Sequence, residues 1–164
     1  MFPMDIQSVL SLAKAFVGLI VVFGALLAYG AGRGNRALVS LILGIYIGLL
    51  VSLKFPYYDA VYRLATAGEH GAPIVAVVLF ALFAALGTLL FSRLLPRDYE
   101  DTYEGVPKKL LLAALATVLI MALSYHALPV TALINPGPAV GALFGPPEYF
   151  FWLLIAPLVG LFFI

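Results

Sequence analysis

The sequence predicts an all-α membrane protein: a polytopic transmembrane helix bundle with four to five membrane segments and one short amphipathic helix at the interface. Of the 164 residues, 64% are hydrophobic and 10% are charged, whereas soluble domains are about half apolar and about a quarter charged. The mean hydropathy is +1.11. Because a soluble fold of this length has too little interior for so much apolar surface, we expect the lipid bilayer to cover it.

Five apolar runs approach the length of about 20 residues that a spanning helix needs. They are continuous and rich in Leu, Ala and Val, which favours helices over the short alternating strands of a membrane barrel. The last run is short and contains Pro157, so it either crosses the bilayer or only dips into it. The runs cover roughly residues 9–30, 37–53, 73–95, 109–128 and 149–164.

Composition excludes several functional classes for this single domain, residues 1–164. A net charge of +1 lacks the excess of Lys and Arg that a nucleic-acid-binding surface needs. The absence of cysteine excludes disulfides, zinc thiolates and thiol catalysis. The first run holds Lys14 and follows Asp5 with no basic residue before it, unlike a cleaved signal peptide. We expect no nucleic-acid partner, no metal and no cofactor.

The connections between the runs differ in character. Residues 32–36 (Gly-Arg-Gly-Asn-Arg) are short and polar, so we expect a tight turn and a helical hairpin. Pro56 ends the second run. An amphipathic interfacial helix should follow, with Asp59 and Arg63 on its polar face. Its apolar face should carry Tyr57, Val61, Leu64 and Ala65.

The two later connections each leave two alternatives open. The hydrophilic stretch 97–109 is either a solvated loop or a docking motif for a partner, and its acids are Asp98, Glu100, Asp101 and Glu104. The stretch 129–148 is rich in Pro and Gly yet almost uncharged. Such a segment is re-entrant, with its backbone satisfied inside the bundle, or it lies at the interface, held by Leu133, Phe144 and Tyr149.

The basic residues set the orientation through the positive-inside rule. Three of them, Lys14, Lys54 and Arg63, fall on one side of the membrane. The other six mark the cytoplasmic side: Arg33, Arg36, Arg93, Arg97, Lys108 and Lys109. This places the amino terminus on the outer side of the membrane. The carboxyl terminus lies inside if all five runs cross, and outside if the fifth only dips.

Small residues in the second run predict close helix packing. Gly44 and Gly48 form a GxxxG pattern, which lets two helix backbones approach each other. The contact is either between two copies of the chain or within one chain. We favour one chain, because several neighbouring helices are available. Further small residues that suit close packing are Ala81, Ala85 and Thr88 in the third run and Ala113, Ala116 and Thr117 in the fourth.

Two ionisable residues, Lys14 and His126, fall within apolar runs, where such residues suggest a polar pathway. The alternative without a functional role is that each side chain extends to water at a membrane interface. No carboxylate falls within the membrane segments, which argues against a cation-coupled carrier acting as a monomer. We expect Glu69 and His70 to be solvated loop residues. No catalytic set of residues is visible, so we expect no enzyme.

One family resemblance covers roughly residues 9–128. An apolar helix leads into residues 32–41 (GRGNRALVSL), and the second helix ends in Phe55-Pro56-Tyr57-Tyr58 before an amphipathic stretch and a third helix. This order resembles the CvpA family, the colicin V production proteins of bacterial inner membranes. The resemblance implies a protein linked to colicin export and envelope homeostasis, without established catalysis. The chain departs from the pattern in its proline-rich fourth connection and its last run.

We therefore expect a non-enzymatic, CvpA-like scaffold or accessory subunit of the cell envelope. Its partners would be the lipid bilayer and either further copies of the chain, as a homo-oligomer, or other membrane proteins. The alternative is a subunit of a small transporter or channel, built from several protomers around a water-filled path. That path would be lined by Lys14, Ser124, His126 or Asn135.

Overall fold

The computed structural model describes residues 6–65, 71–95, 105–128, 130 and 138–163. This part of the chain is a bundle of α-helices without a strand, and four of them are long and apolar enough to cross a membrane: α1, α2, α4 and α5. The predicted fold class is thereby confirmed. The helices are α1 (Ile6–Arg33), α2 (Asn35–Lys54), α3 (Tyr58–Ala65), α4 (Gly71–Leu94), α5 (Val106–His126), α6 (Pro138–Phe144) and α7 (Pro147–Phe163).

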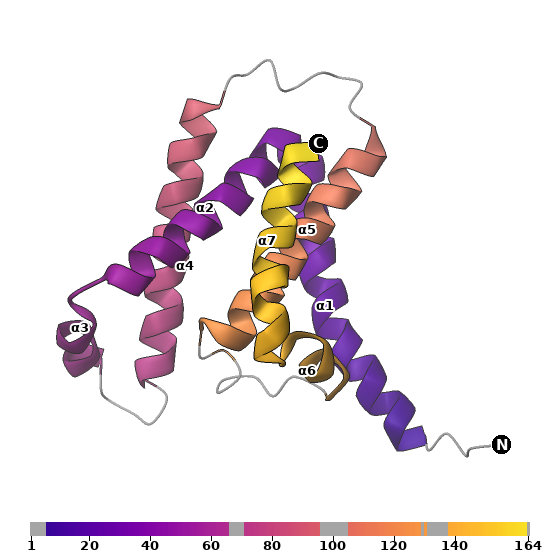
Figure 1. Cartoon of the computed structure of the whole chain (residues 1–164), viewed down its shortest axis with the longest axis horizontal. Helices are drawn as coiled ribbons and strands as arrows, with labels where there is room; N and C mark the ends of the chain where they lie inside the picture. Colours follow the sequence, from indigo (N-terminus) through magenta and orange to yellow (C-terminus); the bar gives the residue numbers. More distant parts are fainter. Residues whose placement is uncertain (1–5, 66–70, 96–104, 129, 131–137, 164) are drawn as a thin grey trace.

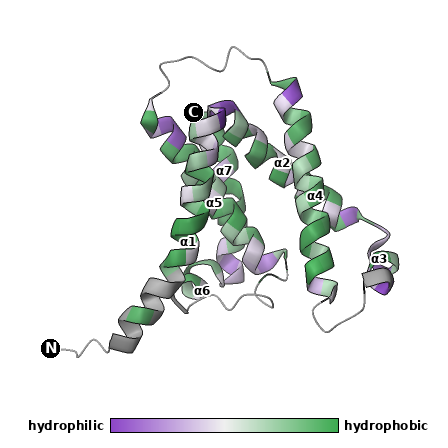
Figure 2. Ribbon diagram, turned by 180° about the vertical axis from the view of Figure 1, so that it is seen from behind, coloured by the Kyte–Doolittle hydropathy of each residue, from purple (hydrophilic) through white to green (hydrophobic). Residues whose placement is uncertain are grey.

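The chain passes back and forth between two ends of the bundle (Figure 1). One end holds the start of α1, together with α3 and α6. The other end holds the turn between α1 and α2 and the carboxyl-terminal end of α7. Hydrophobic residues follow the long helices, and hydrophilic residues gather towards their ends (Figure 2). Each long helix therefore has the polarity profile of a membrane span.

The turn between α1 and α2 is a single residue, Gly34, which is shorter than the predicted stretch 32–36. Its N–H donates to the carbonyl of Gly30 at 2.8 Å, and its φ of 81° lies in the region that glycine adopts without strain. The two helices diverge from this turn and form a splayed hairpin (Figure 1). They diverge because α2 packs most extensively against α4.

Helix α5 is the centre of the bundle. It packs against α1, α2, α6 and α7. Its Leu112, Ala113, Ala116 and Leu119 have no exposed surface. From α2, the side chains of Leu38 and Ile42 complete this apolar interior. Helix α4, in contrast, packs chiefly against α2 and α3 and lies at the edge.

The outer surfaces of the long helices are apolar. On α1, Ile20 is 61% exposed, and on α4, Leu86 is 57% exposed. Large apolar side chains are exposed along the same helices at Val17, Val21, Val78, Leu82 and Leu89. In water such surface would be unfavourable, whereas in a membrane lipid tails or other membrane proteins cover it. This pattern fits a protein that spans the membrane several times.

Helix α7 runs beside α5 from the end that holds α6 to the opposite end (Figure 1). Its 17 residues span about 25 Å at 1.5 Å per residue, slightly less than the hydrocarbon core of about 30 Å. Gly160 permits close contact with α5, since a Cβ added there would lie 2.5 Å from the Leu115 side chain. The last run therefore forms one continuous helix despite Pro157.

Helix α6 enters the bundle from the side that holds α3. Its Val140 and Phe144 are buried against Leu19 of α1 and against Val118 and Met121 of α5. Val118 lies eight residues before the end of α5, which corresponds to a depth of about 12 Å. The contacts of α6 are those that the re-entrant alternative requires. Of the three residues of the interfacial alternative, Phe144 is buried, Tyr149 is exposed and Leu133 lies outside the described residues.

Candidate functional site

Gly44 and Gly48 lie on the face of α2 that packs against α4. A Cβ atom added to Gly48 would lie 2.8 Å from the backbone nitrogen of Ala84. From the other helix, a Cβ added to Gly87 would lie 2.9 Å from the carbonyl oxygen of Gly44. The two backbones leave no room for a side chain where they cross, which is how small residues let membrane helices approach. The structure thus brings both glycines against a helix of their own chain.

The α4 side of this crossing agrees with the expected one only at Thr88, whose backbone nitrogen would overlap with a Cβ added to Gly44. Ala81 and Ala85 are exposed, whereas Phe80, Ala84 and Gly87 are buried against α2. Each residue lies 100° further round a helix than the last, so the buried face is centred about one position away from Ala81 and Ala85. The spacing of Phe80, Ala84 and Gly87 at i, i+4 and i+7 is the sequence signal for this face. On α5, the small residues Ala113, Ala116 and Thr117 are buried.

The described basic residues of the expected cytoplasmic set lie at the end of the bundle with the α1–α2 turn: Arg33, Arg36, Arg93, Lys108 and Lys109. Arg97 lies outside the described residues. Two of the set begin α5, where the helix dipole disfavours positive charge. Helix stability therefore does not account for their position.

Arg36 also connects two helices, which the sequence did not indicate. Its Nη2 donates to the carbonyl oxygen of Ser92 near the end of α4. The last carbonyls of a helix have no partner within it, and a positive charge there is favourable. Arg36 therefore fastens the start of α2 to the end of α4, beyond the crossing at Gly44 and Gly48.

His126 connects α5 to α6. Its Nε2 donates to the carbonyl oxygen of Phe144 at 2.7 Å, and its ring centroid lies 4.7 Å from that of Phe150. Phe144 ends α6, so this carbonyl lacks a helical partner. The structure thus places His126 on a backbone group of its own chain, in a half-buried position. This arrangement holds the short helix in the bundle.

Of the other residues suggested for a polar path, Ser124 is bonded within its own helix. The Ser124 hydroxyl donates to the carbonyl of Ile120, one turn earlier in its own helix, at 2.7 Å. Thr117 in α5 makes the same kind of bond to Ala113 at 2.7 Å. Such local bonds satisfy hydroxyl groups in an apolar surrounding. The side chain of Lys14 and the whole of Asn135 lie outside the described residues.

Tyr46 joins α2 to α7. Its hydroxyl donates to the carbonyl oxygen of Leu154, three residues before Pro157. Proline has no N–H and pushes against the preceding turn, which weakens the helical bonds of that turn. The carbonyl that loses its helical donor is that of Leu153, and the Tyr46 hydroxyl bonds to the next carbonyl along, in the same weakened turn. The sequence contained both residues but no sign that they meet.

An aromatic cluster holds α3 against the end of α2 and the middle of α4. The ring of Phe55 lies 5.3 Å from that of Tyr58 and 5.3 Å from that of Phe83 in α4. The hydroxyls of Ser52 and Tyr58 are 2.6 Å apart. The ring of Tyr62 stacks on Tyr58 at 5.6 Å. These contacts fix the face that α3 turns outward.

Tyr57 does not belong to the packed face, contrary to the expected pattern. It precedes the helix and is 65% exposed, while Tyr58 and Tyr62 take the packed side. The turn after Pro56 causes this shift, since the helix begins only at Tyr58. Burial, with the neighbouring Tyr58 and Asp59, raises the pKa of Tyr62. The side chains of Leu64 and Ala65 lie outside the described set.

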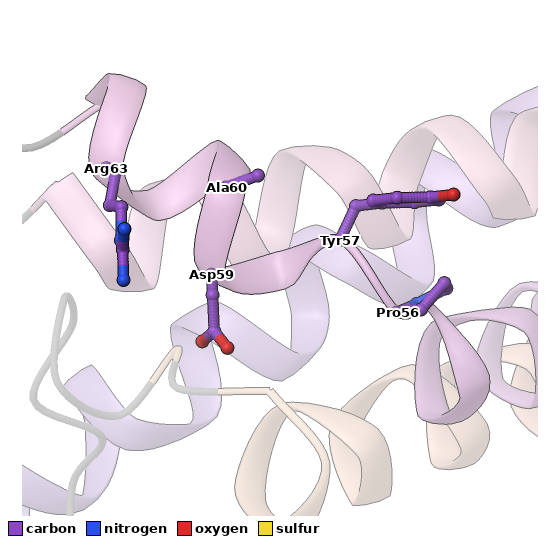
Figure 3. Close-up of a pocket in the computed structure, with 5 residues that line it drawn as sticks. All are labelled: Pro56, Tyr57, Asp59, Ala60 and Arg63. Carbon is purple, nitrogen blue, oxygen red and sulfur yellow. The ribbon is translucent and has the colours of Figure 1, made fainter.

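The outward face of α3 borders an open hollow of about 610 Å³. Asp59 and Arg63 point to the same side of the helix (Figure 3). They lie one turn apart, and both are exposed. The residues that line the hollow are Pro56, Tyr57, Asp59, Ala60 and Arg63.

No group of three metal-ligating side chains occurs among the residues that the structure describes. Glu69 and His70 lie outside these residues. No protein-family model, no curated protein and no solved structure matches the chain.

Proposed function

We propose that this protein is a non-enzymatic scaffold or accessory subunit of the bacterial inner membrane, which acts by packing against other membrane proteins. The observation that carries the proposal is the packed apolar interior around α5. Leu112 and Leu119 have no exposed surface there, and Leu123 has 1%. A water path along the axis of a single chain would have to replace these side chains.

Two polar side chains within the spans support the same proposal. His126 and Tyr46 donate to backbone carbonyls, which joins helices rather than lining a path. The sequence order over roughly residues 9–128, which resembles the CvpA family, agrees with a small envelope protein that works through partners. Helix α4 offers the surface for such a partner, because Leu82 and Leu86 are exposed on its outer side.

The proposed topology has five crossings, with the amino terminus outside and the carboxyl terminus in the cytoplasm. It rests on the path of α7 beside α5 and on the end of the bundle that holds Arg33 and Arg36. With this orientation, α3 and α6 face the periplasm.

The scaffold proposal is tested by photocrosslinking in the native membrane. A benzophenone amino acid at Leu86, exposed on α4, should crosslink the chain to one defined membrane protein, or to a second copy of itself. The matched control is position Phe80, which is buried against α2 and should give crosslinks within the chain. Crosslinks to lipid alone from Leu82, Leu86 and Leu89 would contradict the proposal.

Reconstitution tests the alternative that the chain forms a transporter or channel. Purified protein in liposomes should leave the leakage of potassium, chloride and protons at the level of empty liposomes. Leakage that rises with the protein-to-lipid ratio would overturn the scaffold proposal. If the leakage also changed with a substitution at His126, the polar path would be the better account.

A further inference from the structure

The outward face of α3 presents two opposite charges in one hollow. Asp59 and Arg63 are both exposed and point to the same side (Figure 3). At four residues apart on a helix, their Cβ atoms are separated by about 6 Å. Pro56 and Tyr57 add apolar surface to the same hollow of about 610 Å³. The site therefore suits a ligand that carries a negative and a positive group close together, attached to an apolar body.

The position of α3 places this hollow at the membrane interface. The helix lies between the end of α2 at Lys54 and the start of α4 at Gly71. Its aromatic face rests on Phe55, the residue after α2, and the ring of Phe55 in turn contacts Phe83, midway along α4. An amphipathic helix in this position lies at the level of the lipid headgroups. Lipid headgroups are therefore the molecules that the hollow meets at the highest local concentration.

The charge at this end of the bundle favours a zwitterionic headgroup over an anionic one. The described charged side chains here are balanced, with Lys54 and Arg63 against Asp59 and Glu148. At the opposite end, the described basic residues are Arg33, Arg36, Arg93, Lys108 and Lys109. By sequence, the connection from α4 to α5 adds Arg97 and four acids, Asp98, Glu100, Asp101 and Glu104, so six basic residues against four acidic ones leave a net charge of +2. An anionic lipid would find more complementary charge at that opposite end.

We propose that the hollow on α3 binds the headgroup of a phosphatidylethanolamine-type lipid. The guanidinium of Arg63 binds the phosphate, because its planar N–H groups match phosphate oxygens. The carboxylate of Asp59 accepts hydrogen bonds from the primary ammonium group. A quaternary choline group has no N–H to donate, so phosphatidylcholine binds less well. The exposed ring of Tyr57 lies beside the glycerol region of the lipid, as tyrosine does at membrane interfaces.

This inference does not depend on the scaffold proposal. It requires only that α3 lies at a membrane interface, whichever side of the membrane that is. A transporter or channel with the same fold would hold the same site.

Native mass spectrometry of the full chain in mild detergent tests the inference. The protein is given equal amounts of phosphatidylethanolamine and phosphatidylglycerol, and the bound lipids are counted. We expect the wild type to retain phosphatidylethanolamine about fivefold better, a difference typical of one charge-assisted hydrogen bond at an exposed site. Asp59→Asn should remove this preference, and Arg63→Gln should weaken binding of both lipids. Equal or stronger retention of phosphatidylglycerol by the wild type would overturn the proposal.

The matched control is Arg93→Gln, an exposed arginine at the other end of the bundle, which should keep the wild-type preference. Unchanged retention of phosphatidylethanolamine by the double variant Asp59→Asn, Arg63→Gln would also show that the lipid does not bind in the hollow on α3. Soluble phosphoethanolamine and inorganic phosphate form the last arm. Neither should displace the lipid at millimolar concentration, and displacement would identify a site for a soluble phosphate compound instead.

Discussion

Single residues set the distance between α2 and α4. At Gly48, the backbone of Ala84 occupies the space that any side chain would need. At Gly24 on α1, in contrast, no heavy atom lies within 4 Å of an added Cβ. These two glycines lie in helices of similar polarity and differ in what surrounds them, so they form a natural pair for substitution.

We expect Gly48→Ala to destabilise the protein by about 1–3 kcal/mol, because the added methyl group overpacks a backbone contact that cannot yield without moving a helix. Gly24→Ala should leave stability unchanged or slightly raised, since alanine is the better helix former. Thermal unfolding in detergent, followed by circular dichroism, measures both. Equal melting temperatures for the two variants would show that the helices do not meet at Gly48.

The hydrogen bond of His126 makes a second prediction at this scale. His126→Phe keeps an aromatic ring but leaves the Phe144 carbonyl without its donor, which costs about 1–3 kcal/mol in a dry site. We expect the amides of α6 to exchange with solvent at least about tenfold faster. His126→Gln retains an N–H donor and should preserve much of the protection. Hydrogen exchange measured by mass spectrometry tests this prediction. Unchanged exchange of the α6 amides in His126→Phe would contradict the anchoring role of His126.

The sequence could indicate some of these residues and not others. Gly44 and Gly48 were recognisable because small residues four apart have a known packing use. The bonds from Arg36 to Ser92 and from His126 to Phe144 were not, because each ends on a backbone carbonyl of a distant helix. Every residue carries such a carbonyl, so no sequence pattern marks the partner.

At the scale of elements, the apolar runs located the long helices well. The predicted second run, 37–53, became α2 at Asn35–Lys54. The helices extend past the runs because polar residues continue a helix into the headgroup region, where apolar composition is no longer needed. The faces of the short helices were harder to predict. The packed side of α3 depends on where the turn after Pro56 ends, and α6 depends on the cavity that α1 and α5 leave for it.

The contact between α2 and α7 makes the prediction at this scale. Tyr46→Phe removes the donor to Leu154, and Pro157→Ala restores the helical bond that proline lacks. We expect Tyr46→Phe alone to lower stability by about 1 kcal/mol. In the Pro157→Ala background it should cost less, since the N–H at 157 then bonds to the Leu153 carbonyl and the turn that holds Leu154 is no longer weakened. Unfolding of the four proteins of this cycle gives a coupling energy of about 0.5 kcal/mol or more, and strict additivity would contradict the link.

At the scale of the whole molecule, composition was sufficient to predict a membrane helix bundle. It could not predict which helices are neighbours. Helix α4 packs chiefly against α2 and α3, although α5 is the next long helix in the chain. The neighbours are chosen by complementary small faces, such as Gly44 and Gly48 against Ala84 and Gly87. The choice of α5 as the central helix follows from its buried alanines and leucines, which apolar periodicity alone does not separate from lipid-facing residues.

The proposed topology has five crossings of the bilayer around a packed interior. Because the sequence has no cysteine, single-cysteine variants can be labelled cleanly with a membrane-impermeant maleimide in intact cells. The informative positions are Gly68→Cys, Thr102→Cys and a cysteine added after Ile164. The expected result is labelling at 68 alone, with 102 and the carboxyl terminus labelled only after permeabilisation. Labelling of the carboxyl-terminal cysteine together with 68, and apart from 102, would show that α7 does not cross and would contradict this topology.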